Sequence, residues 1–206
     1  MNSTISLQND SFPLQIAYPG LVTGVGIDHE AKIEGEFKLG VHFDYTWGMP
    51  VVYGSSVKGV LRAYFKDFYQ GGNDKPNAEY LFYDIFEGRN MAKEHQLNDD
   101  KKYYKSIYDR DIFFDAVITE ADSKERILCS DSITPHGDNP LRNPTPLTFL
   151  KIAAGCTMEF RFKLVDTKDE NGDVIFSKDN KKELFEEIIK TVGIGAKTNV
   201  GYGQFQ

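Results

Sequence analysis

The chain has 206 residues and a mass of 23.4 kDa, which is enough for one large domain with a buried core. Its formal net charge of −7 excludes a protein that binds nucleic acid by attraction over its whole surface, so any such contact needs a local basic patch. Residues 1–20 hold no Lys, no Arg and no long apolar run, so we expect neither a signal peptide nor a spanning helix. Cys129 and Cys156 fit neither a metal pattern nor a disulfide scaffold, which favours a reducing cytoplasm.

The first part of the chain combines strand patterns with glycine. Residues 12–19 predict a short strand, and residues 31–45 predict a long half-buried strand because apolar and polar side chains alternate there. Between them, residues 20–30 hold three glycines within seven residues, which indicates backbone that approaches another group closely. His29 lies in this loop and, without a located partner, fits a surface or packing residue better than a general base.

The residues after this region predict a turn and then an amphipathic helix, with Ser55 or Ser56 as its N-cap. Lys58 and Arg62 are four residues apart, so both project from the same side of the helix near its start. Helix N–H groups, serine hydroxyls and two cations together predict an anion site. An ordinary capped helix with a solvated basic side remains the alternative.

The middle of the chain predicts a second helix at residues 77–87, followed by a charged, irregular insertion at about 88–110. Strands are predicted at residues 112–119 and 126–133, where the isolated Asp115 and Asp131 fit turn caps better than metal ligands. Residues 134–146 hold four prolines and predict an irregular loop. Further strands are predicted at residues 147–152, 156–164 and, after an Asn171-Gly172 turn, 174–176.

A last helix is predicted to start at Asp179 or Asn180 and to end at Gly193, where a glycine-rich segment begins. This segment, Gly193–Gly203, holds four glycines in eleven residues, and bare backbone of this kind can form an anion-binding concavity. The side chains between the glycines supply one charge, two short hydrogen-bonding groups and one flat ring: Lys197, Thr198, Asn199 and Tyr202. A flexible tail, or a helix cap followed by a closing strand, is the alternative.

A phosphate-binding loop of the Walker type does not fit this segment. That pattern needs a glycine directly before the Lys-Thr pair and a helix after it. Ala196 takes the glycine position, and the sequence runs only to Gln206, so we expect no such helix.

The order strand–helix–strand–strand–helix, with alternating antiparallel strands, predicts an α+β, ferredoxin-like fold in which the sheet packs on two helices. We expect residues 1–206 to form a single domain that carries the charged insertion.

Two motifs carry a resemblance to a known family. The run Pro50–Arg62, with its Gly-Ser-Ser-Val-Lys-Gly-Val-Leu-Arg core, resembles the signature of the repeat-associated mysterious protein (RAMP) superfamily of CRISPR proteins, and Gly193–Gly203 is similar to its C-terminal glycine-rich loop. Tyr53-Gly54 departs from the pattern, because a second proline usually precedes that glycine. Within the superfamily, four stretches resemble the sixth subunit of type III-B (Cmr) effector complexes: residues 18–26, 43–45, 131–136 and 195–203.

The resemblance implies a non-catalytic, RNA-binding structural subunit of an RNA-guided antiviral complex. Such a subunit would hold the 3′ region of the guide RNA, contact the guide–target duplex and cap the filament of backbone RAMP subunits beside the neighbouring tail subunit. We expect no cofactor, no metal and no membrane partner.

These expectations define a set of candidate RNA-binding residues, with Tyr202 available to stack on a base. The set is Gly24, Gly26, Ser55, Ser56, Lys58, Arg62, Gly193, Gly195, Lys197, Thr198, Asn199, Gly201, Tyr202 and Gly203. Two alternatives remain. One is a metal-independent endoribonuclease that processes guide RNA with His29 or His136 and Lys197. The other is a protein–protein scaffold in which the glycine loops only pack.

Overall fold

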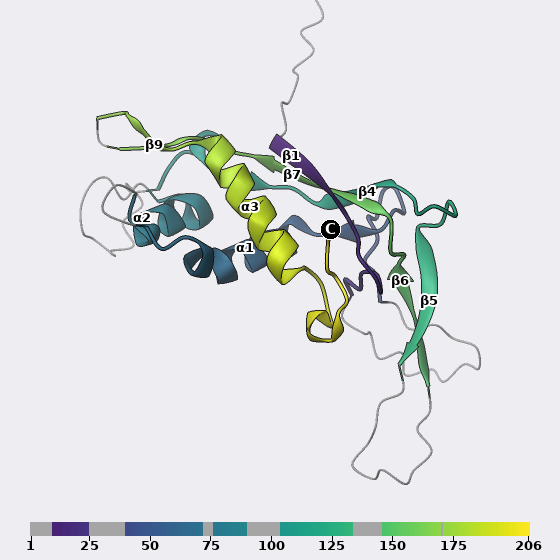
Figure 1. The fold of residues 1–206 in the computed structure, drawn as a ribbon. Helices are drawn as coiled ribbons and strands as arrows, with labels where there is room; N and C mark the ends of the chain where they lie inside the picture. The colour runs from purple at the N-terminus through teal and green to yellow at the C-terminus, as the bar shows by residue number, and fades with distance from the viewer. Residues whose placement is uncertain (1–9, 25–39, 72–75, 90–103, 134–145, 170) are drawn as a thin grey trace, which may run out of the picture. The chain divides into compact units, whose positions relative to one another are not determined.

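The computed structural model of the chain describes residues 10–24, 40–71, 76–89, 104–133, 146–169 and 171–206 (Figure 1). These residues gather into two compact units. The first lies within residues 1–12, 53–115 and 160–189, and the second within residues 13–52, 116–159 and 190–206. The prediction of a single domain stays a prediction. In the described part of the chain, no helix is long and apolar enough to cross a membrane.

The first unit contains the helices, which Figure 1 shows in blue and yellow-green. The apolar faces of two long helices are buried because their apolar residues recur at helical spacing. Its elements are α1 (Gly54–Phe68), α2 (Ala78–Phe82), a π-helical turn η1 (Tyr83–Glu87), a 3₁₀ turn η3 (Ile107–Asp109), β3 (Ile112–Phe113), β8 (Thr167–Lys168), β9 (Val174–Phe176) and α3 (Lys178–Val192), whose last residues belong to the second unit.

Phenylalanine rings in tilted and edge-to-face contact form the core of the first unit. The ring of Phe185 on α3 lies 5.8 Å from the ring of Phe113 and 5.5 Å from that of Phe162. Phe86 on η1 lies 5.4 Å from Phe65 on α1. Aromatic pairs at these distances contribute beyond their buried area, so the helices and the sheet of this unit share one core.

The second unit is built from strands and from the end of the chain. β2 (Val51–Val52) pairs with β4 (Ala116–Glu120), which pairs with the first half of β7 (Thr157–Lys163). β5 (Leu128–Ile133) and β6 (Leu147–Ile152) form an antiparallel ladder with Asp131 opposite Phe149. A 3₁₀ turn η4 (Thr198–Val200) lies near the end of the chain.

The main sheet has the strand order β1–β7–β4–β2, where β1 is Asp10–Gln15, and β3 also pairs with β7. The observed pairings are antiparallel. This combination of antiparallel sheet and helices confirms the predicted α+β class. The strands at 147–152 and 174–176 and the helix end at Gly193, which has φ +73, are confirmed as well. The last helix is also confirmed, although it starts at Lys178 rather than at Asp179 or Asn180.

Two strand predictions differ from the structure. β1 covers Asp10–Gln15 rather than 12–19. Ile16 forms an isolated bridge with Phe205, and the chain then turns after Ala17, whose carbonyl accepts from the Gly20 amide. The strand predicted at 31–45 lies mostly outside the described residues, and its described end forms a turn instead.

The strand predicted at 112–119 is divided into β3 and β4. Both parts pair with β7, but the pairing register shifts by one residue between Phe113 and Val117. Such an irregularity re-aims the side chains at the break. Asp115 lies there, and its carboxylate accepts a hydrogen bond from the Gly54 amide.

The ends of the charged insertion are ordered. Arg89 and Tyr104 form an antiparallel bridge, and the Lys105 amide donates to the Gly88 carbonyl at 2.8 Å. The part of the insertion between them, residues 90–103, lies outside the described residues.

Candidate nucleic-acid interface

The glycine-rich segment packs closely against the loop at residues 20–22. The Gly203 amide donates to the Gly20 carbonyl at 2.8 Å, and the Ala196 amide donates to the Val22 carbonyl at 2.7 Å. A Cβ on Gly195 would collide with the Val22 carbonyl, and both Gly195 and Gly203 have positive φ. These glycines are therefore needed for backbone packing, whereas the sequence predicted an anion-binding concavity for their segment.

The part of the segment between these contacts is presented to solvent. Lys197 has φ +63, a left-handed conformation that is uncommon for a residue other than glycine. Its carbonyl accepts from the amides of Val200 and Tyr202, which closes a tight turn around η4. Lys197 and Asn199 are exposed at this turn. A fixed turn thus holds one cation and one amide toward solvent.

The Tyr202 side chain is buried and hydrogen-bonded within the protein. It is 9% exposed, and its ring lies 6.0 Å from the ring of Phe149. Its hydroxyl donates to Asp131 at 2.8 Å, and Lys151 Nζ donates to the same carboxylate oxygen at 2.5 Å. This burial contradicts the expectation that the ring is available to stack on a base. Asp131 is the acceptor of this group and lies within β5, whereas the sequence favoured a turn cap at this residue.

The pKa values of Tyr202 and Asp131 depend on each other. Burial raises the pKa of Tyr202 to about 12, and the Asp131 charge adds to the effect. Burial alone would also raise the pKa of Asp131, but the hydrogen bonds from Lys151, Tyr202 and the Ser132 amide outweigh it and leave that pKa below its ordinary value. The carboxylate is therefore charged and the phenol neutral at neutral pH.

The N-terminus of α1 differs from the prediction. Neither Ser55 nor Ser56 caps the helix, because the helix already starts at Gly54, and Tyr53 holds the cap position without a side-chain cap hydrogen bond. The Asp115 carboxylate accepts from the Gly54 amide at 2.7 Å instead. A negative side chain already satisfies the first amide of the helix, so the helix end is less open to an external anion than the sequence suggested.

Lys58 and Arg62 have different surroundings. Arg62 donates to Glu87 at 2.9 Å and lies over the ring of Phe82. Lys58 lies over the ring of Phe113, 5.6 Å from its centroid. Burial lowers the pKa of Lys58, and the charges of Arg62 and Arg110 lower it further against the opposing effect of Glu87. The positive charge of Lys58 is thus less fully balanced than that of Arg62.

Lys58 borders a shallow pocket of about 270 Å³ that also involves Arg110, a residue of the insertion to which the sequence assigned no role. Arg110 Nε donates to the Lys105 carbonyl at 2.7 Å. No local pattern could have paired Arg110 with Lys58, because 52 residues of chain separate them. The pocket is lined by Gly54, Ser55, Lys58, Ile107, Arg110, Asp111, Ile112 and Phe113.

The remaining candidates divide by position. The Gly24 amide donates to the Gly40 carbonyl at 2.9 Å, whereas Gly26, His29 and His136 lie outside the described residues. Gly193, Gly201 and Thr198 belong to the packed segment with Lys197 and Asn199 in the second unit. The α1 residues Ser55, Ser56, Lys58 and Arg62 belong to the first unit.

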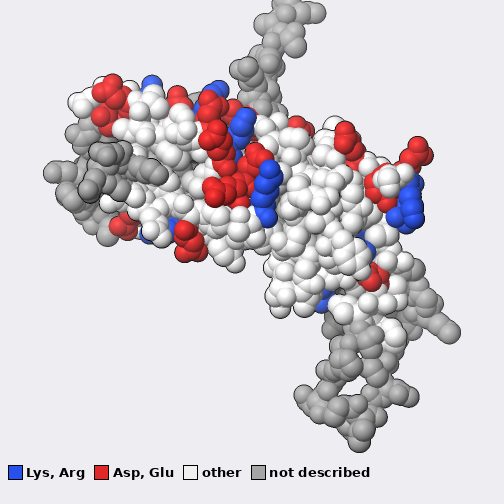
Figure 2. Space-filling view, viewed as in Figure 1, with Lys and Arg blue, Asp and Glu red and all other residues white. Residues whose placement is uncertain are grey.

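The exposed side of α3 is an unfavourable surface for RNA. Asp179, Glu183 and Glu187 are exposed at four-residue spacing and form an acidic row. Figure 2 shows a group of red side chains along this helix on the face in view, with blue side chains beside them. This row would repel a phosphate backbone.

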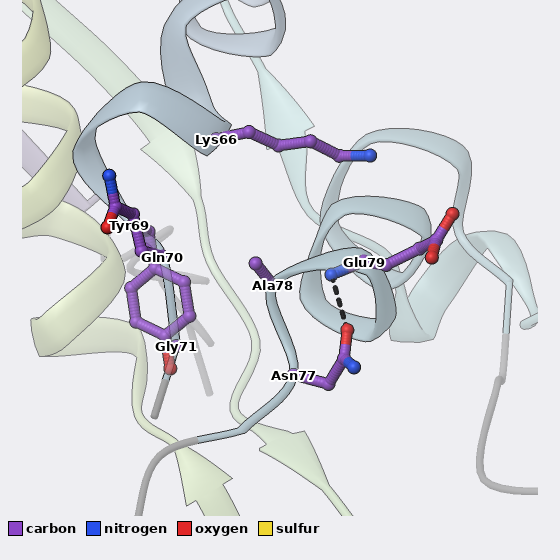
Figure 3. A pocket seen from close by; sticks show the side chains of 7 residues that line it. All are labelled: Lys66, Tyr69, Gln70, Gly71, Asn77, Ala78 and Glu79. Atoms are coloured by element: carbon purple, nitrogen blue, oxygen red, sulfur yellow. Dashed lines mark hydrogen bonds between the residues drawn. The ribbon is translucent and has the colours of Figure 1, made fainter. Parts of the chain in front are cut away.

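A further pocket of about 460 Å³ lies between the end of α1 and the start of α2. Two of its polar side chains bond to the backbone of the fold. The Asn77 carboxamide accepts from the Glu79 amide (Figure 3), and the Tyr69 hydroxyl donates to the Pro76 carbonyl. Lys66 lies over the ring of Phe82, 4.9 Å from its centroid. We therefore assign no ligand to it. Within the described residues, no group of three His, Cys, Asp or Glu side chains could hold a metal ion.

Comparisons with known proteins agree with this architecture. A chain in the cryo-EM structure of the type III-B Cmr-beta complex bound to cognate target RNA superposes with a TM-score of 0.60 at 22% identity. The match covers 95% of this chain and 57% of that chain, so this chain spans little more than half its length. A crystal structure of Cmr6 from Pyrococcus furiosus matches with a TM-score of 0.44 at 18% identity, covering 95% of this chain and 96% of that chain. No curated protein matches the chain.

The likeness to the Cmr-beta chain and the family match below confirm the predicted ferredoxin-like RAMP fold. The family model described as the RAMP superfamily matches residues 14–206, which is nearly the whole chain. The chain therefore belongs to the RAMP superfamily.

Proposed function

We propose that this chain is a non-catalytic RNA-binding subunit of a type III-B CRISPR effector complex, the counterpart of its sixth subunit. It holds the 3′ region of the guide RNA and caps the filament of backbone RAMP subunits. Superfamily membership and the fold shared with a chain of an RNA-bound Cmr-beta structure support this assignment.

The observation that carries the proposal is the exposed Lys197–Asn199 turn. Close backbone packing fixes its shape, so a phosphate or sugar meets a cation and an amide that need little further ordering. Lys58 and Arg110 form a second basic site, in the first unit. Because the chain carries a net charge of −7, its RNA contacts concentrate on these basic sites. Basic neighbouring subunits of the complex supply the remaining positive charge.

The test is retention of guide RNA by the purified chain, alone and assembled with the backbone subunit, over a salt series. We expect tight retention only in the assembly. Lys197→Ala with Asn199→Ala should weaken it and lower the salt slope by about 0.7 for each phosphate that the variant no longer neutralises. Lys124→Ala is the matched control, since Lys124 is an exposed lysine of the same unit outside the turn.

Guide RNAs shortened from either end test which end of the guide RNA the Lys197–Asn199 turn contacts. Shortening the 3′ end should abolish the effect of the Lys197 substitution, whereas shortening the 5′ end should preserve it. Retention that no basic substitution changes would support the protein–protein scaffold instead. Cleavage of the RNA that disappears in a His29→Ala/His136→Ala variant would support the endoribonuclease.

A further inference from the structure

Two large aromatic side chains stand exposed on one turn of the second unit. Tyr45 is 104% exposed and Trp47 is 81% exposed. They are separated by one residue, and we call Tyr45 and Trp47 together the aromatic turn. Aromatic side chains of this size bury about 150–250 Å² each when a partner covers them. Their exposure in the isolated chain is therefore a large unused apolar surface.

The aromatic turn is rigidly supported. The Asp44 carboxylate accepts from the amides of Thr46 and Trp47 at 2.9 and 2.7 Å. The Asp44 carbonyl accepts from the Gly48 amide, and the Asp44 amide donates to the Met49 carbonyl. Such an Asx turn holds the backbone between the two rings in one conformation. Binding through these rings consequently costs little ordering of the chain.

The base of the turn is tied to the core of the same unit. Phe43 and Pro50 form an antiparallel bridge, and the Val51 amide donates to the His42 carbonyl at 2.9 Å. The chain then enters β2, where Val51 and Val52 are each 1% exposed and pair with β4. The rings thus project from a short hairpin anchored in the sheet.

The lack of positive charge in the sequence around the aromatic turn favours a protein partner over RNA. The sequence from Gly40 to Tyr53 contains no Lys and no Arg, and Asp44 is its acidic residue. Aromatic residues that stack on single-stranded RNA lie in positively charged grooves that follow the phosphates. Trp and Tyr are instead enriched among the residues that carry most of the binding energy between proteins, where they fill well-packed pockets of the partner.

We propose that the aromatic turn is the docking element of this chain for a neighbouring protein subunit, with Tyr45 and Trp47 inserted into an apolar pocket of that subunit. The pocket carries hydrogen-bond acceptors for the indole N–H and the phenol O–H, because these groups need partners when they are buried. This inference rests on the proposed function for the identity of the neighbour, which is the backbone subunit.

Trp47 is the single tryptophan of the chain, so it reports on the turn without interference. The full chain labelled with fluorotryptophan gives one fluorine NMR resonance, which is followed during titration with the unlabelled backbone subunit free of RNA. We expect the resonance to shift and lose its sensitivity to solvent. Tyr45→Ala/Trp47→Ala should weaken binding of the subunit, measured by calorimetry, by about thirty-fold or more.

Matched variants separate the rings from the support of the turn. Tyr45→Phe/Trp47→Phe keeps most of the apolar area and should retain most of the affinity. Asp44→Ala keeps both rings but removes the acceptor that orders the turn, so it should weaken binding by less than the double alanine variant. Because both rings are exposed, the double alanine variant should unfold at the same urea concentration as the parent.

Other outcomes overturn the inference. A resonance that shifts with guide RNA alone and not with the subunit would make the turn an RNA-stacking element. A shift that follows the concentration of the chain itself would make it a self-association site. An unchanged resonance in a complex that nevertheless forms and retains RNA would overturn this inference and leave the proposed function intact, whereas failure to join any complex would overturn both.

Discussion

The hydroxyl of Tyr202 donates a 2.8 Å hydrogen bond to the carboxylate of Asp131. This bond joins the C-terminal glycine-rich segment to β5, although 71 residues separate the two. Lys151 on β6 shares the same carboxylate oxygen and lies over the tyrosine ring, 5.5 Å from its centroid. One polar group thus positions the turn that exposes Lys197.

Tyr202→Phe tests this link directly. The ring remains packed on Phe149, so the variant loses only the hydroxyl, and we expect the free energy of unfolding to fall by about 1 kcal/mol in urea titrations. Tyr18→Phe is the control, because Tyr18 is 88% exposed and should leave stability unchanged. Equal stability of the Tyr202→Phe protein and the parent would show that the hydroxyl contributes nothing to the packing of the segment.

Asp131 and Tyr202 together predict that stability falls at both acid and alkaline pH. The pKa of Asp131 is lowered in the folded protein, so its contribution is present above the unfolded value of 3.8 and is lost as the pH falls through the folded value. The pKa of Tyr202 is raised from 10.0 to about 12, so its contribution is complete below pH 10.0 and is lost toward pH 12. The stability difference between the parent and Tyr202→Phe should therefore shrink over that alkaline range. A constant difference up to pH 12 would contradict the assignment.

Asp115→Ala should destabilise the protein by about 1 kcal/mol, since it removes the acceptor for the first amide of α1. Asp115→Asn keeps an acceptor oxygen and should lose less. Asp109→Ala, at an exposed aspartate of the same unit, should be neutral. The measurement is the urea midpoint of each variant, and a loss at Asp109 equal to that at Asp115 would argue against the capping role.

The sequence predicted those helices and strands whose alternation of apolar and polar residues lies entirely within the element. The helix at 178–192, its end at Gly193 and the alternating strand β7 follow from residues that are near neighbours in the chain. The amphipathic face of α1 was predicted for the same reason, with Val57, Leu61 and Phe65 buried.

Long-range partners were not predictable in this way. The cap of α1 comes from Asp115, 61 residues away, so Ser55 and Ser56 were wrong choices even though their local chemistry suits a cap. Tyr202 was assigned to RNA because its neighbours are glycines, and nothing near it in the sequence shows that Asp131 and Phe149 bury it. Lys197 and Asn199 are exposed because of the turn itself, and their RNA-binding role stays a prediction.

Two glycine substitutions should have opposite effects on stability. Gly203→Ala places a Cβ against the Ile194 carbonyl at φ +70, and we expect a loss of more than about 2 kcal/mol together with weaker RNA retention. Gly59→Ala lies in α1 with no atom within 4 Å of the added Cβ, and should stabilise the protein by about 0.5–1 kcal/mol. A tolerated Gly203→Ala would show that the segment can pack without this close approach.

A buried charge network holds α3 in the first unit. Lys181 is 1% exposed and donates to Asp111 at 2.7 Å and to the Val165 carbonyl at 2.5 Å. Asp84, itself buried, accepts from Thr167 and pairs with Lys105. The sequence showed no sign of this network, because Lys181 falls on the side of the helix where apolar residues were expected.

Lys181→Met should destabilise the protein by about 3–5 kcal/mol, since it leaves the Asp111 carboxylate buried without its cation. Burial raises the pKa of Asp111 and Lys181 opposes that rise, so losing Lys181 raises the pKa further. The acid can then be buried neutral, and the loss of stability should decrease as the pH falls. Lys182→Met, at the half-buried neighbour, should change stability by less than about 0.5 kcal/mol. A pH-independent loss in Lys181→Met would indicate that packing of the lysine stem, rather than its charge, holds the helix.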